Sequence, residues 1–305
     1  MNNGPIALIV NPASAGGATG KRWPALKHLL DNSGLRYEPM FTERRGHAAE
    51  LARQAAEQGY RMIAAVGGDG TFHQVVNGLA QTEAMGHVVF GAIPSGTGND
   101  FARNLRIPRD PQQACKRLFE PKIRRIDVGA VEHDVAGEKR RTLFLSAAGA
   151  GLDAAVVVTR ARYPTMLRGR AVYAFCLFRN IFGYRNSEVS LVLDGKELWS
   201  KRVKMIVVSN GQYFGGGMKI APKADYADGR LDVVTVGDIG NLAFLLALPS
   251  VYTGSHLGHP KVEACRAGEV EIRSREELPL QADGEILGHT PCTIRTLPGA
   301  LAVLT

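Results

Sequence analysis

Short apolar runs alternate with helical patterns through about the first 95 residues of the chain. Ile6 to Val10, Met62 to Val66 and Val88 to Ile93 are continuous apolar runs of the kind found in buried parallel strands. Arg22 to Leu30 and Ala48 to Gln58 carry apolar residues at helical spacing, and both patterns end close to a glycine. The strand-like run Leu35 to Phe41 lies between these two helical patterns. This β-α-β-α-β order predicts a doubly wound α/β domain.

The pattern changes beyond about residue 125, where short strand-like runs are separated by glycine turns. The expected strands are Leu143 to Ala147, Glu188 to Leu193, Val203 to Val208 and Leu231 to Val236. Asp-Gly and Asn-Gly pairs between and beyond these runs are typical of antiparallel pairing in a sandwich or barrel. Two helical patterns, Ala171 to Phe182 and Leu242 to Tyr252, interrupt the strands.

The length of 305 residues exceeds a comfortable single core, so the chain is expected to form two domains. We place the α/β domain over residues 1–128 and the mainly β domain over residues 129–295. A C-terminal tail, about residues 296–305, is expected to return to the first domain.

The net charge of +8, from 37 basic and 29 acidic side chains, favours anionic partners. Nucleic acid, nucleotide phosphates and acidic lipid headgroups all satisfy this charge. Because the chain has no recognised nucleic-acid motif and no regular basic-aromatic stripe, we expect no nucleic-acid partner.

The cysteines and the apolar runs indicate a cytoplasmic protein. The four cysteines lie far apart without a CxxC pair, which indicates neither a zinc site nor a disulfide framework. The N-terminal run stops at Asn11-Pro12, too early for a signal peptide, and the longest apolar stretch, Leu242 to Leu248, is far below the roughly 20 residues of a membrane-spanning helix. Any membrane contact is therefore expected to be peripheral.

A glycine-rich loop, Gly67-Gly68-Asp69-Gly70-Thr71, follows an expected strand and precedes an expected helix. In this context backbone N–H groups and a helix N-terminus can hold phosphate oxygens. Asp69 would repel a phosphate, so its useful roles are to bind Mg²⁺ through water or to orient an attacking group. A structural turn with a capping aspartate is the alternative.

A second loop, Pro94-Ser95-Gly96-Thr97-Gly98-Asn99-Asp100, also follows a strand and precedes a helix. Adjacent parallel strands place their C-terminal loops side by side, so both loops are expected to face one nucleotide. The chain has no Walker-type pattern. Helix capping by Asn99 or Asp100 is the alternative role for those two side chains.

These motifs together resemble the diacylglycerol kinase catalytic-domain family, and among its members the bacterial YegS-like lipid kinases. The resemblance rests on Asn11-Pro12 with Gly16-Gly17, the two loops, Asn210 to Gly217, Pro222 to Asp232 and Asp283-Gly284-Glu285. It covers nearly the whole chain and implies a first domain like that of NAD kinases and phosphofructokinases.

The resemblance also implies a function. ATP and Mg²⁺ are the expected cofactors, and a lipid hydroxyl, with diacylglycerol as the first candidate, is the expected phosphoryl acceptor. A sphingoid or ceramide-type lipid kinase is the alternative enzyme. A nucleotide-sensing, membrane-associated protein without turnover is the alternative from another class, and a homodimer is left open.

Residue by residue, the resemblance implies a set of nucleotide contacts. They are Asn11, Thr42, Gly67, Gly68, Asp69, Gly70, Thr71, Phe72, His73, Gln74, Ser95, Gly96, Thr97, Asn99 and Asp100. The family usually has Asn-Glu where this chain has His73-Gln74. Gln74 keeps the length of a glutamate and loses its charge, which puts any metal contact of that carboxylate in doubt. His73 either replaces the asparagine hydrogen bond or lies without function on the helix surface.

Phosphoryl transfer to an alcohol needs a group that accepts the hydroxyl proton. Asp283-Gly284-Glu285 is the best candidate, because the glycine permits a sharp turn that presents two acids. The resemblance makes Glu285 the proton acceptor with Asp283 beside it, and Asp69 is the third candidate catalytic acid. An exposed Asp-Gly hairpin turn is the alternative.

The segment from Asp225 to Asp232 places three acids within eight residues around a turn glycine, as a loop for a hard cation can do. The resemblance implies a structural Mg²⁺ held by Asp225, Asp228 and the backbone carbonyl of Arg230. A solvated acidic turn is the alternative.

Residues 156–185 mix aromatic and apolar side chains with arginines, a composition that suits an anionic membrane surface. The set is Tyr163, Leu167, Tyr173, Phe175, Phe178 and Phe182 with Arg160, Arg162, Arg168, Arg170, Arg179 and Arg185. A helix that packs within its domain and leaves its arginines in water is the alternative.

Overall fold

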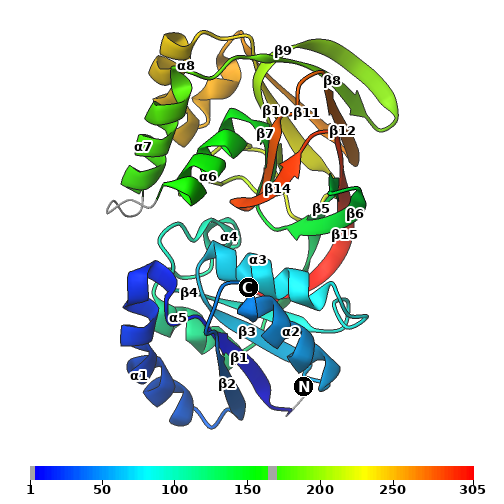
Figure 1. The fold of residues 1–305 in the computed structure, drawn as a ribbon. Helices are drawn as coiled ribbons and strands as arrows, with labels where there is room; N and C mark the ends of the chain where they lie inside the picture. The colour runs from blue at the N-terminus through cyan, green and yellow to red at the C-terminus, as the bar shows by residue number, and fades with distance from the viewer. Residues whose placement is uncertain (1–3, 164–169) are drawn as a thin grey trace. The chain divides into compact units, whose positions relative to one another are not determined.

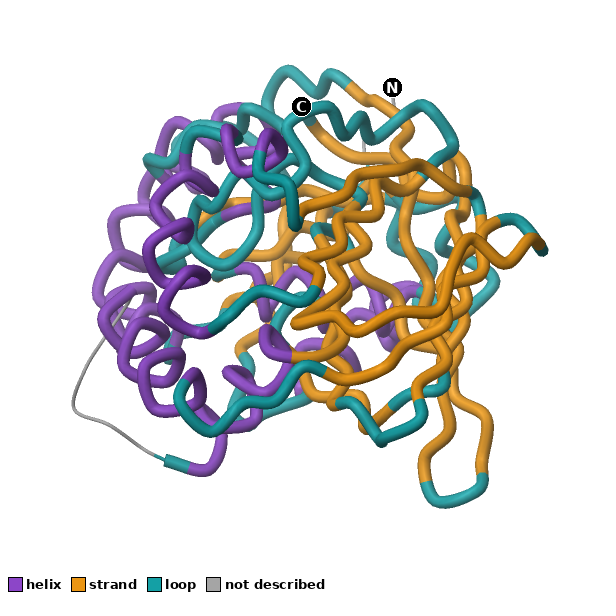
Figure 2. The backbone as a smooth tube through the Cα atoms, turned by 90° about the horizontal axis from the view of Figure 1, so that it is seen from above, coloured by secondary structure: helices purple, strands orange, loops and turns teal. Residues whose placement is uncertain are grey.

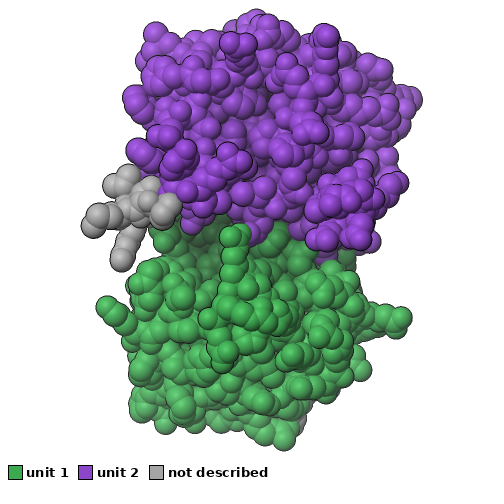
Figure 3. Space-filling model, in the orientation of Figure 1, with its two compact units in different colours: residues 1–127, 299–305 green, residues 128–298 purple. Residues whose placement is uncertain are grey.

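The chain divides into two compact units, coloured separately in Figure 3. The computed structural model describes residues 4–163 and 170–305. The first unit comprises residues 1–127 and 299–305, and the second comprises residues 128–298. Figure 1 labels their helices and strands, and Figure 2 traces strands in orange and helices in purple.

The first unit is an α/β domain built on a parallel sheet. Its strands are β1 (Ile6–Val10), β2 (Tyr37–Phe41), β3 (Met62–Gly67) and β4 (Val89–Pro94), in the order β2-β1-β3-β4. The end of β15 (Cys292–Leu304) adds to this sheet, with Ala302 and Val303 parallel to Val89 and Phe90 of β4. Because all these strands are parallel, the loops after β3 and β4 leave the same edge of the sheet.

Helices and a short 3₁₀ turn connect the strands of the first unit. They are η1 (Ser14–Gly17), α1 (Ala18–Asp31), α2 (His47–Glu57), α3 (Asp69–Leu79), α4 (Asp100–Asn104) and α5 (Pro111–Cys115), followed by η2 (Lys116–Leu118). A Cβ on Gly78 of α3 would lie 2.1 Å from the carbonyl oxygen of Ala49 on α2, so this helix pair requires glycine.

Three buried phenylalanines fix the two glycine loops to the sheet. Phe72 of α3, Phe90 of β4 and Phe101 of α4 have ring centroids 6.1 Å apart in each pair. Such contacts add to the burial of the rings, and they hold the starts of α3 and α4 against the same strand.

The second unit is mainly β. Its strands are β5 (Ile123–Val135), β6 (Glu138–Phe144), β7 (Ala147–Gly151), β8 (Ser187–Leu193), β9 (Lys196–Ser209), β10 (Leu231–Gly237), β11 (Val262–Ala267), β12 (Glu269–Ser274), β13 (Pro279–Ala282) and β14 (Glu285–His289). The antiparallel order is β14-β13-β7-β9-β8-β12-β15. The second half of the long strand β9 also pairs with β10, and β10 pairs with β11.

Three helices lie together on one flank of these strands (Figure 1). They are α6 (Leu152–Arg162), α7 (Arg170–Ile181) and α8 (Asn241–Ala247), with 3₁₀ turns at Leu248–Tyr252 and Ser255–Gly258. Leu152, Ile181 and Phe244 bring one buried side chain from each helix into a shared apolar cluster. None of the described helices is both long and apolar enough to cross a membrane.

Two sequence expectations in the second unit differ from the structure, and one helix was not expected. The expected strand Leu143 to Ala147 is broken by a bend at Leu145 and Ser146, between β6 and β7. The expected helix Leu242 to Tyr252 is α8 followed by a 3₁₀ turn, because Pro249 removes a backbone donor. Helix α6 was not expected, because its start, Leu152, follows a run of small residues without a helical pattern.

Candidate active site

The two glycine loops of the first unit touch through their backbones. A Cβ on Gly96 would lie 2.4 Å from the Cα of Gly68, and a Cβ on Gly68 would lie 3.0 Å from the Cα of Gly96. The Ser95 N–H donates to the carbonyl oxygen of Gly67 at 2.6 Å. Gly96 must therefore be a glycine for the two loops to approach as closely as they do.

Asp69 joins the same two loops with its side chain. Its Oδ1 accepts a hydrogen bond of 3.0 Å from the backbone N–H of Phe101, in the first turn of α4. An aspartate at the start of α3 also interacts favourably with the positive end of that helix. Asp69 thus acts as a capping residue, but the N–H group that it caps belongs to α4, after the neighbouring loop, and not to its own helix.

Five backbone N–H groups of these loops donate no hydrogen bond to the described residues. They belong to Gly68, Gly70, Thr97, Gly98 and Asn99. Gly68 and Gly70 lie at the N-terminus of α3, an 11-residue helix whose dipole adds positive potential there. Converging N–H groups at a helix start are suited to binding phosphate oxygens.

Polar side chains from the residue after β1 and from α1 support the two loops. The Asn11 side chain donates to the hydroxyl of Thr71 at 3.0 Å. The buried Thr19 hydroxyl donates to the Ser95 hydroxyl at 2.8 Å. Thr42 follows β2, and its N–H donates to the Val10 carbonyl at 2.9 Å. Thr42, Asn11 and both loops thus follow the carboxyl ends of adjacent parallel strands.

Asn99 shapes the second loop and does not cap a helix. It has a left-handed backbone conformation with a φ of 52°, and its side chain does not cap α4. Instead, its Oδ1 accepts from the N–H of Gly96 and its Nδ2 donates to the Gly96 carbonyl, each at 3.0 Å. Asp100 lies 3.5 Å from the guanidinium of Arg103.

His73 is buried at 5% exposure, which corrects the alternative of a histidine on the helix surface. Its carbonyl accepts from the Asn77 side chain at 2.9 Å, and its Nε2 lies 3.4 Å from the same nitrogen. Gln74 is half-buried on α3. The two residues that depart from the family pattern therefore have different surroundings.

Asp283 is bound to the backbone of its own unit. Its carboxylate accepts from the N–H groups of Leu145 at 2.6 Å, Ser146 at 2.9 Å and Ala147 at 3.2 Å. Asp283 and Gly284 have φ values of 49° and 85° and form the hairpin turn between β13 and β14. The backbone thus forms the Asp-Gly hairpin turn that was the alternative interpretation of this segment. The Asp283 side chain, however, supports the bend between β6 and β7.

A hydrogen-bonded chain that sequence reasoning missed runs from this turn to α6. The Gly284 N–H donates to Gln281 Oε1 at 2.9 Å, and Gln281 Nε2 donates to Asp153 Oδ2 at 3.0 Å. Asp153 Oδ1 is buried without a hydrogen-bond partner among the described residues, and burial raises the pKa of Asp153 to about 6. Glu285, the first residue of β14, is half-buried next to this chain.

The turn expected to hold a structural Mg²⁺ uses its carboxylates differently. Asp225 Oδ1 accepts from the N–H of Ala227 at 3.1 Å, and Asp228 Oδ1 accepts from the N–H of Arg230 at 3.0 Å. Within residues 4–163 and 170–305, no three acidic, histidine or cysteine side chains are grouped as a metal site would require. The donor set present therefore does not fit a divalent ion.

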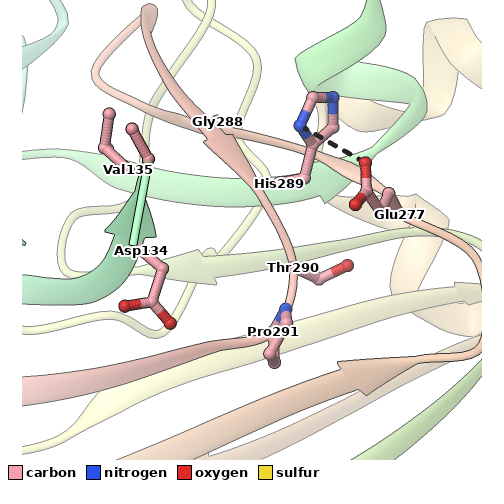
Figure 4. A pocket seen from close by; sticks show the side chains of 8 residues that line it. Asp134, Val135, Glu277, Gly288, His289, Thr290 and Pro291 are labelled. Atoms are coloured by element: carbon pink, nitrogen blue, oxygen red, sulfur yellow. Dashed lines mark ion pairs between the residues drawn. The ribbon is translucent and has the colours of Figure 1, made fainter. Parts of the chain in front are cut away.

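A separate hollow of about 340 Å³ lies in the second unit (Figure 4). Its lining includes Asp134, Glu277 and His289, and the last two form a loose pair at 4.0 Å. None of the residues expected to bind ATP, metal or the lipid hydroxyl lines it. It gives no support to any of those roles.

The comparisons with known proteins identify the fold and the family. Residues 5–131 match the diacylglycerol kinase catalytic domain, and residues 146–305 match the YegS C-terminal NAD kinase beta sandwich-like domain. A structure of a candidate diacylglycerol kinase from Bacillus anthracis strain Sterne aligns with a TM-score of 0.78 and 25% identity, covering 98% of this chain and 96% of that one. An NAD kinase from Archaeoglobus fulgidus, in complex with ATP, shares the fold with a TM-score of 0.55 and 15% identity, covering 98% of this chain and 93% of that one.

Curated relatives agree with this assignment. The candidate lipid kinase YtlR of Bacillus subtilis (strain 168) is 30% identical, and the alignment covers 98% of each chain. A diacylglycerol kinase of Mycobacterium tuberculosis (strain ATCC 25618 / H37Rv) is 29% identical over 99% of this chain and 95% of the relative. The chain has an NAD kinase-like fold, and it belongs to the diacylglycerol kinase family of YegS-like lipid kinases, which use ATP.

The buried carboxyl of Asp153 predicts a pH-dependent stability. Its pKa is raised from 3.8 to about 6, so the folded state favours the protonated form and loses stability as pH rises through that interval. We expect Asp153→Asn to gain roughly 1 kcal/mol of unfolding free energy relative to wild type between about pH 5 and about pH 7.5. Urea unfolding at both pH values measures the difference.

The control is Glu120→Gln, which removes the carboxylate of an exposed side chain. The gain in unfolding free energy expected for Asp153→Asn should be absent in this variant. A pH-independent difference for Asp153→Asn as well would show that its carboxyl is ionised in the fold like an exposed one.

Proposed function

We propose that this chain transfers the γ-phosphoryl group of ATP to the hydroxyl of a diacylglycerol or related glycerolipid at the cytoplasmic surface of a membrane. The observation that carries the proposal is the pair of glycine loops in backbone contact, with N–H groups available at the start of α3. Family membership supports the same chemistry. The second unit, with its own sandwich, would supply the lipid-binding part.

The two loops would bind the phosphates of ATP through their backbones. The N–H groups of Gly68 and Gly70 lie at the N-terminus of α3, and those of Thr97 and Gly98 belong to the neighbouring loop. Bulky side chains at Gly68 and Gly96 would force the loops apart, so both glycines are needed for the two loops to bind the same phosphates.

Mg²⁺ bound to ATP would offset the negative charge that phosphoryl transfer concentrates on the phosphate oxygens. Asp69, in the first loop, is the carboxylate that would hold it, through water. Its Oδ1 is fixed by the Phe101 N–H, which gives the side chain a defined direction. Gln74 carries no charge, so it would contribute a hydrogen bond only.

Glu285 would accept the proton of the lipid hydroxyl. Asp283 accepts hydrogen bonds from three backbone N–H groups, and these bonds assign its side chain to holding the turn. Glu285 follows that turn directly at the start of β14. A carboxylate on a strand, next to a turn held by hydrogen bonds, has a fixed position, and a general base needs such a position.

We therefore expect Glu285→Gln to lower the turnover of diacylglycerol with radiolabelled ATP by about 10²- to 10⁴-fold, the usual contribution of a general base. ATP affinity, measured by calorimetry, should stay within about twofold of wild type. Ceramide and sphingosine are assayed in parallel, because activity on either one and not on diacylglycerol would favour the sphingoid alternative.

Glu138→Gln is the control, since the Glu138 side chain is 76% exposed on β6. Its turnover should equal that of wild type. Wild-type turnover in Glu285→Gln would remove Glu285 from the mechanism. ATP binding without any phosphorylated lipid, in the wild type itself, would favour the nucleotide-sensing alternative.

The membrane would be contacted by an apolar surface on α7 and α8. Phe178 and Phe182 are 61% and 66% exposed with their rings 5.1 Å apart, and Leu242 and Leu246 are 71% and 75% exposed. Leu242 and Leu246 are four residues apart within α8, which places them on one helix face, and Phe182 directly follows the end of α7. Arg179, stacked on Tyr163 at 4.3 Å, adds positive charge for lipid phosphates.

Part of the expected membrane surface is not described. Leu167 and Arg168 lie outside the described residues, and so does the side chain of Arg170. The homodimer left open by the sequence is not part of this proposal.

We expect Phe178→Ser with Leu246→Ser to weaken binding to vesicles of phosphatidylglycerol and phosphatidylcholine by about tenfold or more, because two exposed apolar side chains are lost. Co-sedimentation over a lipid titration measures the change. Leu198→Ser, at an exposed leucine on β9, is the control and should bind like wild type. Equal losses in both proteins would place the membrane contact elsewhere.

A further inference from the structure

A single arginine, Arg266, binds several oxygens of the acidic turn between residues 223 and 232. Arg266 lies on β11 directly opposite Asp232 on β10. Its Nη1 is 3.1 Å from Asp228 Oδ2, its Nε is 3.4 Å from Asp232 Oδ1, and its Nη2 donates to the Lys223 carbonyl at 2.6 Å. One guanidinium therefore joins three oxygens of the turn.

The geometry of this contact follows from strand register. Asp232 and Arg266 are cross-strand neighbours, a position at which opposite charges stabilise a β pair. From this position the planar guanidinium also contacts Asp228. Its N–H donors have a fixed geometry, which the ammonium group of a lysine lacks.

Both oxygens of Asp228 accept hydrogen bonds or ion pairs from the protein. Oδ2 faces Arg266, and Oδ1 accepts from the N–H of Arg230. A Mg²⁺ would need these oxygens in a nearly octahedral shell at short distance. It would also have to lie close to a positive guanidinium, which would repel it.

Asp232 depends on the same arginine. Its side chain is 12% exposed and its Oδ1 lies 3.4 Å from Nε of Arg266, whose side chain is 41% exposed. Removing Arg266 would leave the mostly buried Asp232 carboxylate without its ion-pair partner, and an uncompensated buried charge is destabilising.

We propose that Arg266 takes the place of a divalent cation in this turn, because its guanidinium pairs with the carboxylates of Asp228 and Asp232. The stability of the second unit is then independent of Mg²⁺. The proposal concerns this chain's own structure, and it holds whether or not ATP brings Mg²⁺ to the first unit.

Thermal unfolding of the full chain, without nucleotide or lipid, tests it. The wild-type midpoint should be the same in Mg²⁺ and in a chelator. Arg266→Leu should lower the midpoint by about 5 °C, and Arg266→Lys should lower it by an intermediate amount, because lysine keeps the charge and loses the fork. Arg273→Leu is the control, since Arg273 is 65% exposed in its pair with Glu271, and it should shift the midpoint by about 1 °C or less.

Two results would overturn the proposal. In the first, Mg²⁺ raises the unfolding midpoint of the wild type by more than it raises the midpoint of Asp228→Asn. Such a difference would require a metal ion bound to Asp228. The other is an Arg266→Leu midpoint no lower than that of Arg273→Leu. Should Arg266→Leu not fold, the comparison of wild type with Asp228→Asn still decides the question. Because no arm of the experiment uses ATP or lipid, its outcome is independent of the proposed kinase reaction.

Discussion

The backbone contact between Gly68 and Gly96 is the constraint on which the nucleotide half of the protein depends. It exists because β3 and β4 are adjacent and parallel, so that their following loops leave the sheet side by side. Asp69 then fixes the distance between the loops through the Phe101 N–H, and the buried phenylalanine rings hold α3 and α4 in place. The available N–H groups follow from this packing.

The hydrogen-bond partners of the candidate acidic residues distinguish their roles. Asp69 and Asp283 each bind backbone N–H groups that belong to another segment, and this is how each one shapes a loop. Asp153 is held by Gln281 in a buried position that favours its protonated form. Glu285 follows the turn that Asp283 holds, at the start of β14, and it is the acid to which we assign the chemistry.

Sequence patterns predicted the first unit better than the second, for a physical reason. Buried parallel strands are continuous apolar runs, so Ile6–Val10 was placed correctly from the sequence alone. The second unit depends on contacts between distant residues, and strands such as β11 are half-exposed without an apolar run. The partnership of Arg266 with Asp228 and Asp232 has no local signal, because strand register alone brings them together. The family assignment is confirmed, whereas the roles of the individual site residues stay predictions.

Mass spectrometry of a total lipid extract incubated with the protein, ATP and Mg²⁺ tests the central claim most directly. The account predicts new phosphorylated glycerolipids that require ATP, and it predicts their loss in Gly96→Ala, where the added Cβ would collide with Gly68. An extract in which the wild-type protein binds ATP and no lipid gains a phosphoryl group would contradict it.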